Sequence, residues 1–195
     1  MKTLQNKMLW IVAALVSLMA MTRFNHFGSS VALPDASYAV FFLGGLFLGR
    51  VRGALAILAV LLVEAALVDF YAINFAGVSG WCVTSAYGFL VFAYSALWFV
   101  GRWYAPRHDL SGQGMLGLLA AAVVAGSLAF VIANASFYLL AGYFDSMSVV
   151  DFTASVAQYY SSYVTVAVIY VGCAVVVQML HAMLTGKGQR DSKAA

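Results

Sequence analysis

The sequence predicts an all-α integral membrane protein: a bundle of six transmembrane helices with both termini in the cytoplasm. Of the 195 residues, 64% are hydrophobic and only 9% are charged, whereas a soluble domain carries about 25% charged residues. Six apolar segments are candidates to cross the hydrocarbon core of a bilayer, which takes about 20 helical residues. They cover residues 8–23, 36–49, 53–70, 84–104, 114–141 and 156–184.

The first apolar segment follows Lys2 and Lys7, as the apolar part of a signal peptide does. Because Leu18-Met19-Ala20 does not fit the small-x-small pattern of a cleavage site, we interpret the segment as a retained helix. The fifth and sixth segments are long enough to project beyond the bilayer.

The second apolar segment is short and contains Gly44-Gly45. Because of its short length, we expect this segment to form a helix that is tilted, partly re-entrant or extended into the preceding loop. Small residues at helical spacing let two helix backbones approach closely. We therefore expect close helix contacts, either internal or with a partner protein, at Ala13-xxx-Ser17 in the first segment and at Gly44-Gly45 and Gly49 in the second.

The basic residues predict the orientation of the chain. In a six-span arrangement, nine of the ten Lys and Arg residues fall on one side, and Arg23 alone falls on the other. An excess of Lys and Arg marks the cytoplasmic side of a membrane protein. The loops near residues 24–36, 70–84 and 142–155 then face outward. The nine cytoplasmic residues are Lys2, Lys7, Arg50, Arg52, Arg102, Arg107, Lys187, Arg190 and Lys193.

We expect a single transmembrane domain over residues 1–185 and a polar cytoplasmic tail over residues 186–195. The apolar composition makes the lipid bilayer an expected partner. Nucleic acid is not an expected partner, because the basic residues are sparse and form no stripe. No nucleotide-binding P-loop, His-Glu-x-x-His zinc motif or Gly-x-Ser-x-Gly elbow occurs. An enzyme is the least supported class, because no paired acid and base appear within reach of each other on the outer face.

Glu64 is the one carboxylate well inside an apolar segment. A charge at the centre of a bilayer costs about 2.5–3.5 kcal/mol on insertion scales. We expect Glu64 to form a buried polar contact between helices, with proton coupling as the alternative. His108 and His181 lie near the cytoplasmic end and are expected to be structural.

We expect the ligand-binding site in the outer loop between the third and fourth segments. The uncharged stretch 74–87 of this loop contains the thiol of Cys82. A thiolate is a soft ligand that suits transition metals. If Ser79 caps the fourth helix, Cys82 lies in the first turn, where the helix dipole favours the thiolate. If Thr84 or Ser85 is the cap, Cys82 lies in a free loop. A small buried hydrophobic side chain is the alternative to both.

Polar residues near Cys82 are candidate ligand contacts. Asp69 is a candidate acceptor for amide or hydroxyl donors, with an ordinary interfacial residue as the alternative, and Asn74 and Tyr87 can each donate and accept. His26, in the first outer loop, is a further candidate, with an interfacial hydrogen-bonding role as its alternative. Aromatic residues form either an interfacial belt or the wall of a cleft for a large, flat ligand. They are Trp81, Tyr143, Phe144, Tyr159, Tyr160 and Tyr163.

Six short spans, cytoplasmic termini and a ligand loop between spans three and four resemble the substrate-binding S-components of energy-coupling-factor vitamin transporters. The run Asn74-Phe-Ala-Gly-Val-Ser-Gly-Trp-Cys82 resembles the solitary members of that group from Gram-negative bacteria, the BtuM-type cobalamin transporters. So does Leu33-Pro-Asp-Ala-Ser37 followed by Phe41-Phe-Leu-Gly44. The resemblance covers most of the chain in architecture, and its motifs lie in residues 23–49 and 69–87.

The resemblance implies a transporter of the bacterial inner membrane that binds cobalamin (vitamin B12) from the periplasmic side and has no cofactor of its own. Cys82 matches the cysteine that ligates the corrin cobalt, and Asp69 and Tyr87 match polar residues around the ligand. A thiolate on cobalt pushes electron density towards the opposite axial ligand, which would promote loss of cyanide from cyanocobalamin.

The energy source is a point on which the chain departs from S-components. These present Ala-xxx-Ala on the first span to a coupling subunit, whereas this chain has Ala13-xxx-Ser17. Docking on a shared energy-coupling module and unassisted uptake therefore both stay open. The alternatives for the function as a whole are an S-component for another vitamin or a metal ion, and a non-transporting membrane assembly protein.

Overall fold

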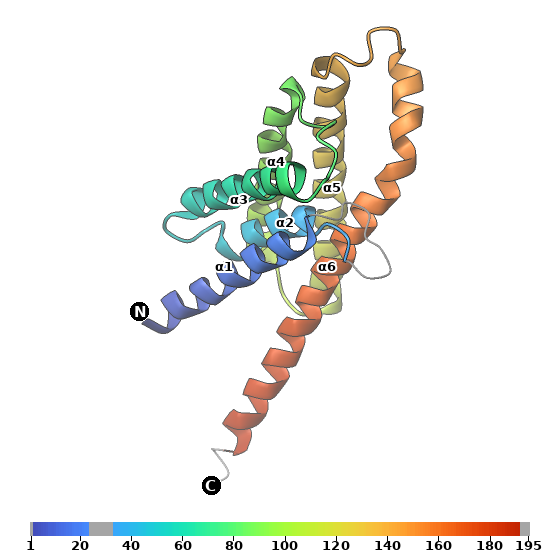
Figure 1. Ribbon diagram of the computed structural model, residues 1–195. Coiled ribbons are helices and arrows are strands. Elements are labelled where there is room, and N and C mark those ends of the chain that lie inside the picture. The colour runs from blue at the N-terminus through green and yellow to red at the C-terminus, as the bar shows by residue number, and fades with distance from the viewer. Residues whose placement is uncertain (1, 24–32, 192–195) are drawn as a thin grey trace.

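The computed structural model describes residues 2–23 and 33–191, with side chains for residues 5–23 and 33–185. All regular structure in these residues is helical (Figure 1), which confirms the all-α prediction. Each expected apolar segment corresponds to a helix. The α-helices are α1 (Lys2–Thr22), α2 (Ser37–Leu48), α3 (Ala54–Phe75), α4 (Leu90–Tyr104), α5 (Gly112–Leu140) and α6 (Val149–Asp191), and the 3₁₀ helices are η1 (Ser85–Phe89) and η2 (Ala105–Arg107).

Four helices in the described part of the chain are long and apolar enough to cross a membrane. They are Gln5–Thr22 of α1, all of α3 and α5, and Val149–Thr185 of α6. The other two expected spans correspond to shorter helices, because α2 has 12 residues and α4 has 15, against the about 20 that a crossing takes. The chain therefore has the helical character of a multi-pass membrane protein.

The short helix α2 is the buried centre of the fold. It packs most extensively against α4 and also contacts α1, α3, α5 and α6. Ten of its 12 residues are buried, so it has no polar face, as is typical of a helix enclosed by others. At its start, Phe41 stacks on Tyr94 of α4 with ring centroids 4.4 Å apart.

Glycines let α2 and α4 pack with their backbones in contact. A Cβ atom at Gly45 would overlap the carbonyl oxygen of Trp98, and one at Gly101 would overlap the carbonyl oxygen of Phe42. A Cβ at Gly44 would meet the ring of Trp98. The predicted close helix contact at Gly44-Gly45 is confirmed, and its partner is α4.

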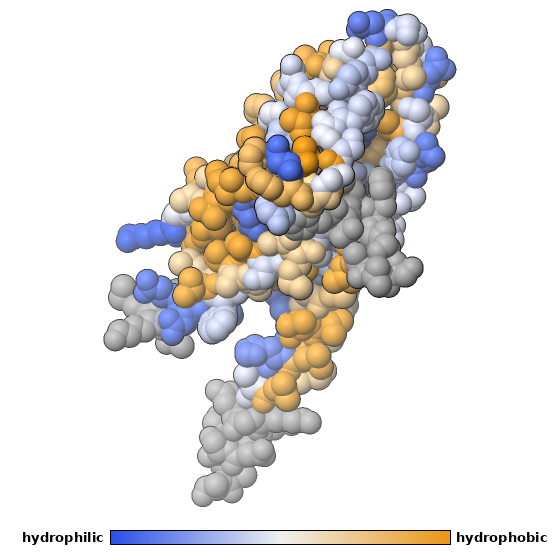
Figure 2. Space-filling view, in the orientation of Figure 1, coloured by the Kyte–Doolittle hydropathy of each residue, from blue (hydrophilic) through white to orange (hydrophobic). Residues whose placement is uncertain are grey.

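Large apolar side chains are exposed over several parts of the face shown in Figure 2, where they appear orange. On α3, Val60, Val63 and Leu67 are each more than half exposed. A surface of this kind is expected where helices face lipid and is rare on a soluble monomer. In Figure 1, α3 runs across the direction of α4 and α5, with α1 on the same side of the fold.

The long helix α6 projects away from the other helices at its C-terminal end (Figure 1). Its 43 residues make a helix about 65 Å long at the usual rise, against about 30 Å for the hydrocarbon core of a bilayer. The expectation that the last segment extends beyond a bilayer agrees with this length. The helix continues to Asp191, inside the expected polar tail.

Replacing Gly45 by Ala should destabilise the protein by about 1–3 kcal/mol, the usual cost of adding volume to a packed core. The added methyl group would push α4 away from α2, since the atom that it meets is backbone. The measurement is the melting temperature in detergent: samples are heated, and the folded fraction is monitored by fluorescence-detected size-exclusion chromatography. Gly172→Ala in α6 is the matched control, because a Cβ there meets nothing within 4 Å. Equal melting temperatures of the two variants would contradict the proposed role of Gly45.

Candidate functional site

Arg23, directly after α1, forms a buried ion pair with Asp69 of α3. The exposed fraction of Arg23 is only 3%. Its Nε donates to Asp69 Oδ1 at 2.7 Å and its Nη2 donates to Asp69 Oδ2 at 2.8 Å. A two-pronged contact of this kind fixes both the distance and the orientation of the two side chains.

The same guanidinium reaches two further helices. Its Nη1 donates to Ser37 Oγ at the start of α2 at 2.8 Å and to the Tyr94 hydroxyl of α4 at 2.7 Å. The Nε also lies 3.2 Å from the carbonyl oxygen of Ala65 on α3. One buried side chain therefore connects the end of α1 with α2, α3 and α4.

Asp69 also connects to η1, because the Tyr87 hydroxyl donates to its Oδ2 at 2.6 Å. Asp69 and Tyr87, two expected ligand contacts, are thus in direct contact with each other. Asp69 is more than an ordinary interfacial residue, since its two oxygens hold Arg23 and Tyr87. The sequence did not identify Arg23 as part of this site. The signal for it was present: Arg23 is the one basic residue that breaks the charge pattern.

Cys82 lies in the loop before η1 and not in the first turn of a helix. Thr84 caps η1, with its hydroxyl accepting from the backbone N–H of Ala86 at 3.2 Å. Ser79 instead accepts from the N–H of Trp81 within the loop. The helix-dipole alternative is therefore wrong, and the free-loop alternative is confirmed.

The thiol of Cys82 is free and exposed, as is that of Cys173, so the two form no disulfide. The alternative of a small buried hydrophobic side chain is therefore wrong. Although the side chain reaches solvent, partial burial raises the pKa of the Cys82 thiol, and the Asp69 carboxylate adds to the rise. Cys82 is therefore protonated at neutral pH. A metal centre that binds such a thiol has to displace its proton.

A pocket of about 350 Å³ brings three expected ligand contacts together beside the loop of Cys82. Asp69, Asn74 and Tyr87 line it, along with Gly80 and Val83, which stand on either side of Cys82 in the sequence. Asn74 donates to the carbonyl oxygen of Phe70 in its own helix at 2.8 Å. The volume is near the lower end of the range for small-molecule sites.

The aromatic residues near this loop form two groups rather than one. Trp81 stacks on Tyr143 with ring centroids 5.2 Å apart and planes at 8°, which ties the Cys82 loop to the loop between α5 and α6. Tyr143 also contacts Phe144. The second group lies between α2, α5 and α6. It consists of Tyr38, Phe130, Tyr160 and Tyr163.

The remaining expected contacts are less closely tied to the loop. Tyr163 of α6 interacts electrostatically with Cys82 but does not line the pocket. Tyr159 lies one turn earlier on α6 and is 43% exposed. His26 falls outside the described residues.

No protein-family model matches the chain, and no curated protein is similar to it at a significant level. The resemblance to S-components therefore stays a prediction that depends on the motifs in residues 23–49 and 69–87.

Replacing Arg23 by Ala should destabilise the protein by about 3–5 kcal/mol, because it leaves the Asp69 carboxylate buried without its cation. The side chain of Asp69 is 14% exposed, too little for water to replace the lost contacts. Thermal unfolding in detergent measures the effect. Arg52→Ala is the matched control, since Arg52 is exposed and its loss should change little. A variant as stable as the wild type would refute a structural role for the ion pair.

Alkylation of Cys82 by iodoacetamide should be slow at pH 7 and should still be rising at pH 9. The thiolate is the nucleophile, so the rate increases about tenfold per pH unit below the thiol pKa, and a raised pKa extends this increase to higher pH. The measurement is labelling followed by intact mass, in a Cys173→Ser background that leaves one thiol. N-acetylcysteine amide, with the ordinary thiol pKa of about 8.5, is the reference. A rate that reaches its plateau below pH 8 would mean that the thiol pKa is lowered.

Proposed function

We propose that the protein is a cobalamin transporter of the bacterial inner membrane, in which Cys82 ligates the cobalt of the corrin from the periplasmic side. The observation that carries the proposal is the exposed thiol of Cys82 beside a pocket lined by Asp69, Asn74 and Tyr87. A cobalt ion already held by a macrocycle needs only an axial ligand from the protein. One soft sulfur atom meets that need.

The surroundings of Cys82 suit the periphery of a corrin. The macrocycle is large, flat and apolar at its faces, and its arms end in amides. Trp81 and Tyr143 offer stacked aromatic surface next to the thiol, and the polar pocket residues can bond amides. The pocket is too small for the whole macrocycle. We therefore propose that the corrin lies over Cys82 with an amide arm in the pocket.

The proposed chemistry is a ligand exchange without a change in oxidation state. The Cys82 thiol loses its proton and its sulfur binds cobalt on the lower axial side, displacing the base there. Cyanide then leaves from the opposite side with the bonding electron pair and takes up a proton, so that hydrogen cyanide is released. The raised pKa of the free thiol supports an arrangement in which deprotonation accompanies metal binding.

The proposal includes six membrane crossings with both termini in the cytoplasm. Nine of the ten basic residues then lie on the cytoplasmic side, in accordance with the positive-inside rule. The short α2 would cross inside a protein environment, since it is enclosed by the other α-helices. Uptake either uses a shared energy-coupling module or proceeds unassisted, with the cobalamin trapped chemically inside the cell.

Cyanocobalamin added to the purified protein should shift its absorption spectrum, because sulfur replaces an axial ligand of cobalt. Cys82→Ala should abolish the shift, and the same samples should release cyanide with the wild type only. Cys173→Ala is the matched control and should behave as the wild type does. A spectral shift of equal size in Cys82→Ala would refute thiolate ligation.

Two further arms of this experiment test the ligand and the side of binding. Excess of a vitamin without cobalt should leave the spectral titration unchanged, whereas competition would favour an S-component for that vitamin. Treating intact spheroplasts with a membrane-impermeant maleimide should block later binding of cobalamin to the extracted protein. Unblocked binding would place Cys82 on the cytoplasmic side.

A further inference from the structure

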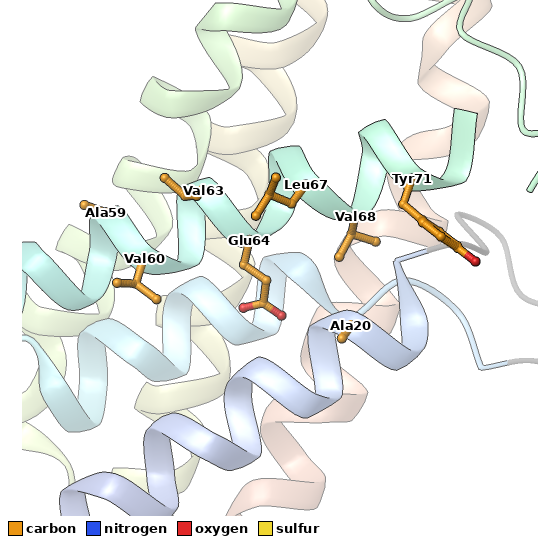
Figure 3. Close-up of a pocket in the computed structure, with 8 residues that line it drawn as sticks. All are labelled: Ala20, Ala59, Val60, Val63, Glu64, Leu67, Val68 and Tyr71. Atoms are coloured by element: carbon orange, nitrogen blue, oxygen red, sulfur yellow. The ribbon is translucent and has the colours of Figure 1, made fainter. Parts of the chain in front are cut away.

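The groove between α1 and α3 contains a carboxylate that the proposed cobalamin site does not use. Its volume is about 540 Å³. Figure 3 shows the side chain of Glu64 leaving α3 and directing its carboxylate towards α1. Apart from Glu64, the lining is almost entirely apolar. It consists of Ala20 from α1 and of Ala59, Val60, Val63, Leu67, Val68 and Tyr71 from α3.

Neither carboxylate oxygen of Glu64 has a hydrogen-bond partner among the described residues, and both are shielded from water. The expected polar contact between helices is therefore not formed within that part of the chain. Arg23 interacts with Glu64 electrostatically, but its guanidinium is bonded to Asp69 and Tyr94. Burying a carboxylate in this way costs free energy unless a proton or a cation neutralises it.

The groove is separate from the pocket beside Cys82, although α3 contributes to both. The pocket is lined by Ala66, Asp69, Phe70, Ile73 and Asn74 of this helix, and the groove by none of these residues. The two sites therefore use different faces of α3. A ligand in the groove would leave the thiol and its polar neighbours uncovered.

The size, apolar lining and single carboxylate of the groove favour one chemical class of ligand. The volume lies within the range for small-molecule sites, and an almost wholly apolar lining favours an aliphatic or aromatic body. A single carboxylate favours one cationic group, and an ammonium supplies up to three donors to its oxygens. The exposed side chains of Val60, Val63 and Leu67 continue the apolar surface outward, so a ligand dissolved in the bilayer can reach the groove.

We propose that the groove between α1 and α3 binds a lipophilic amine, with its apolar body along α3 and its ammonium against Glu64. A slender chain with an ammonium head fits between the two helices, where the carboxylate is directed. The proposal does not depend on cobalamin binding.

The probe is 11-(dansylamino)undecylamine, added to the protein in phosphatidylcholine nanodiscs, with 11-(dansylamino)undecanol as its neutral analogue. The amine should give a saturable rise in dansyl fluorescence that unlabelled dodecylamine displaces, and the alcohol should bind at least tenfold more weakly. Glu64→Gln should weaken binding of the amine at least tenfold. Cys82→Ala should leave it unchanged, which separates this site from the proposed cobalamin site.

A second measurement uses the wild-type chain, in case Glu64→Gln fails to fold. Dicyclohexylcarbodiimide should convert Glu64 to a stable N-acylurea, detected by peptide mass. N,N-dimethyldodecylamine, a tertiary amine that cannot form an amide with the activated carboxyl, should protect it. Equal binding of amine and alcohol, or no protection of Glu64, would overturn the proposal. A wild-type dimer that Glu64→Gln converts to a monomer would also overturn it, because the groove would then be an interface between two copies.

Discussion

The buried guanidinium of Arg23 is the contact on which the arrangement of the helices near the candidate site depends. A cation removed from water must find several acceptors at once, and this one finds them on three helices: Asp69 on α3, Ser37 on α2 and Tyr94 on α4. These contacts bring one side chain from each of three helices to a single guanidinium. The interaction therefore specifies how α1, α2, α3 and α4 meet, in addition to any stability that it contributes.

The position of Cys82 follows from this arrangement. Tyr87, after the thiol in the sequence, donates to the carboxylate that also holds Arg23. Trp81, directly before the thiol, stacks on Tyr143 of the loop between α5 and α6. The loop is thus attached on one side to the buried ion pair and on the other to an aromatic surface contact. Cys82 lies in the chain between these two attachments, and its thiol stays exposed.

The two sites on α3 illustrate how one apolar helix can present different chemistry on its two faces. Asp69 is neutralised within the protein by Arg23, so its charge serves the structure. Glu64, five residues earlier and on another face, has no hydrogen-bond partner among the described residues. The two carboxylates differ because Arg23, at the end of α1, forms hydrogen bonds with Asp69 and not with Glu64. Under the proposal made above, a ligand that supplies a cation would offset the cost of burying Glu64.

Composition and hydropathy by themselves determined the all-α class, the apolar character and the approximate limits of each helix, because these depend on local sequence. The glycines of α2 also indicated close packing. The sequence could not reveal that α4 is the partner of α2, or that Arg23 is buried on Asp69, 46 residues away. Nor could it choose between the two placements of Cys82. These features depend on contacts between segments far apart in the chain, which exist only once the helices have packed.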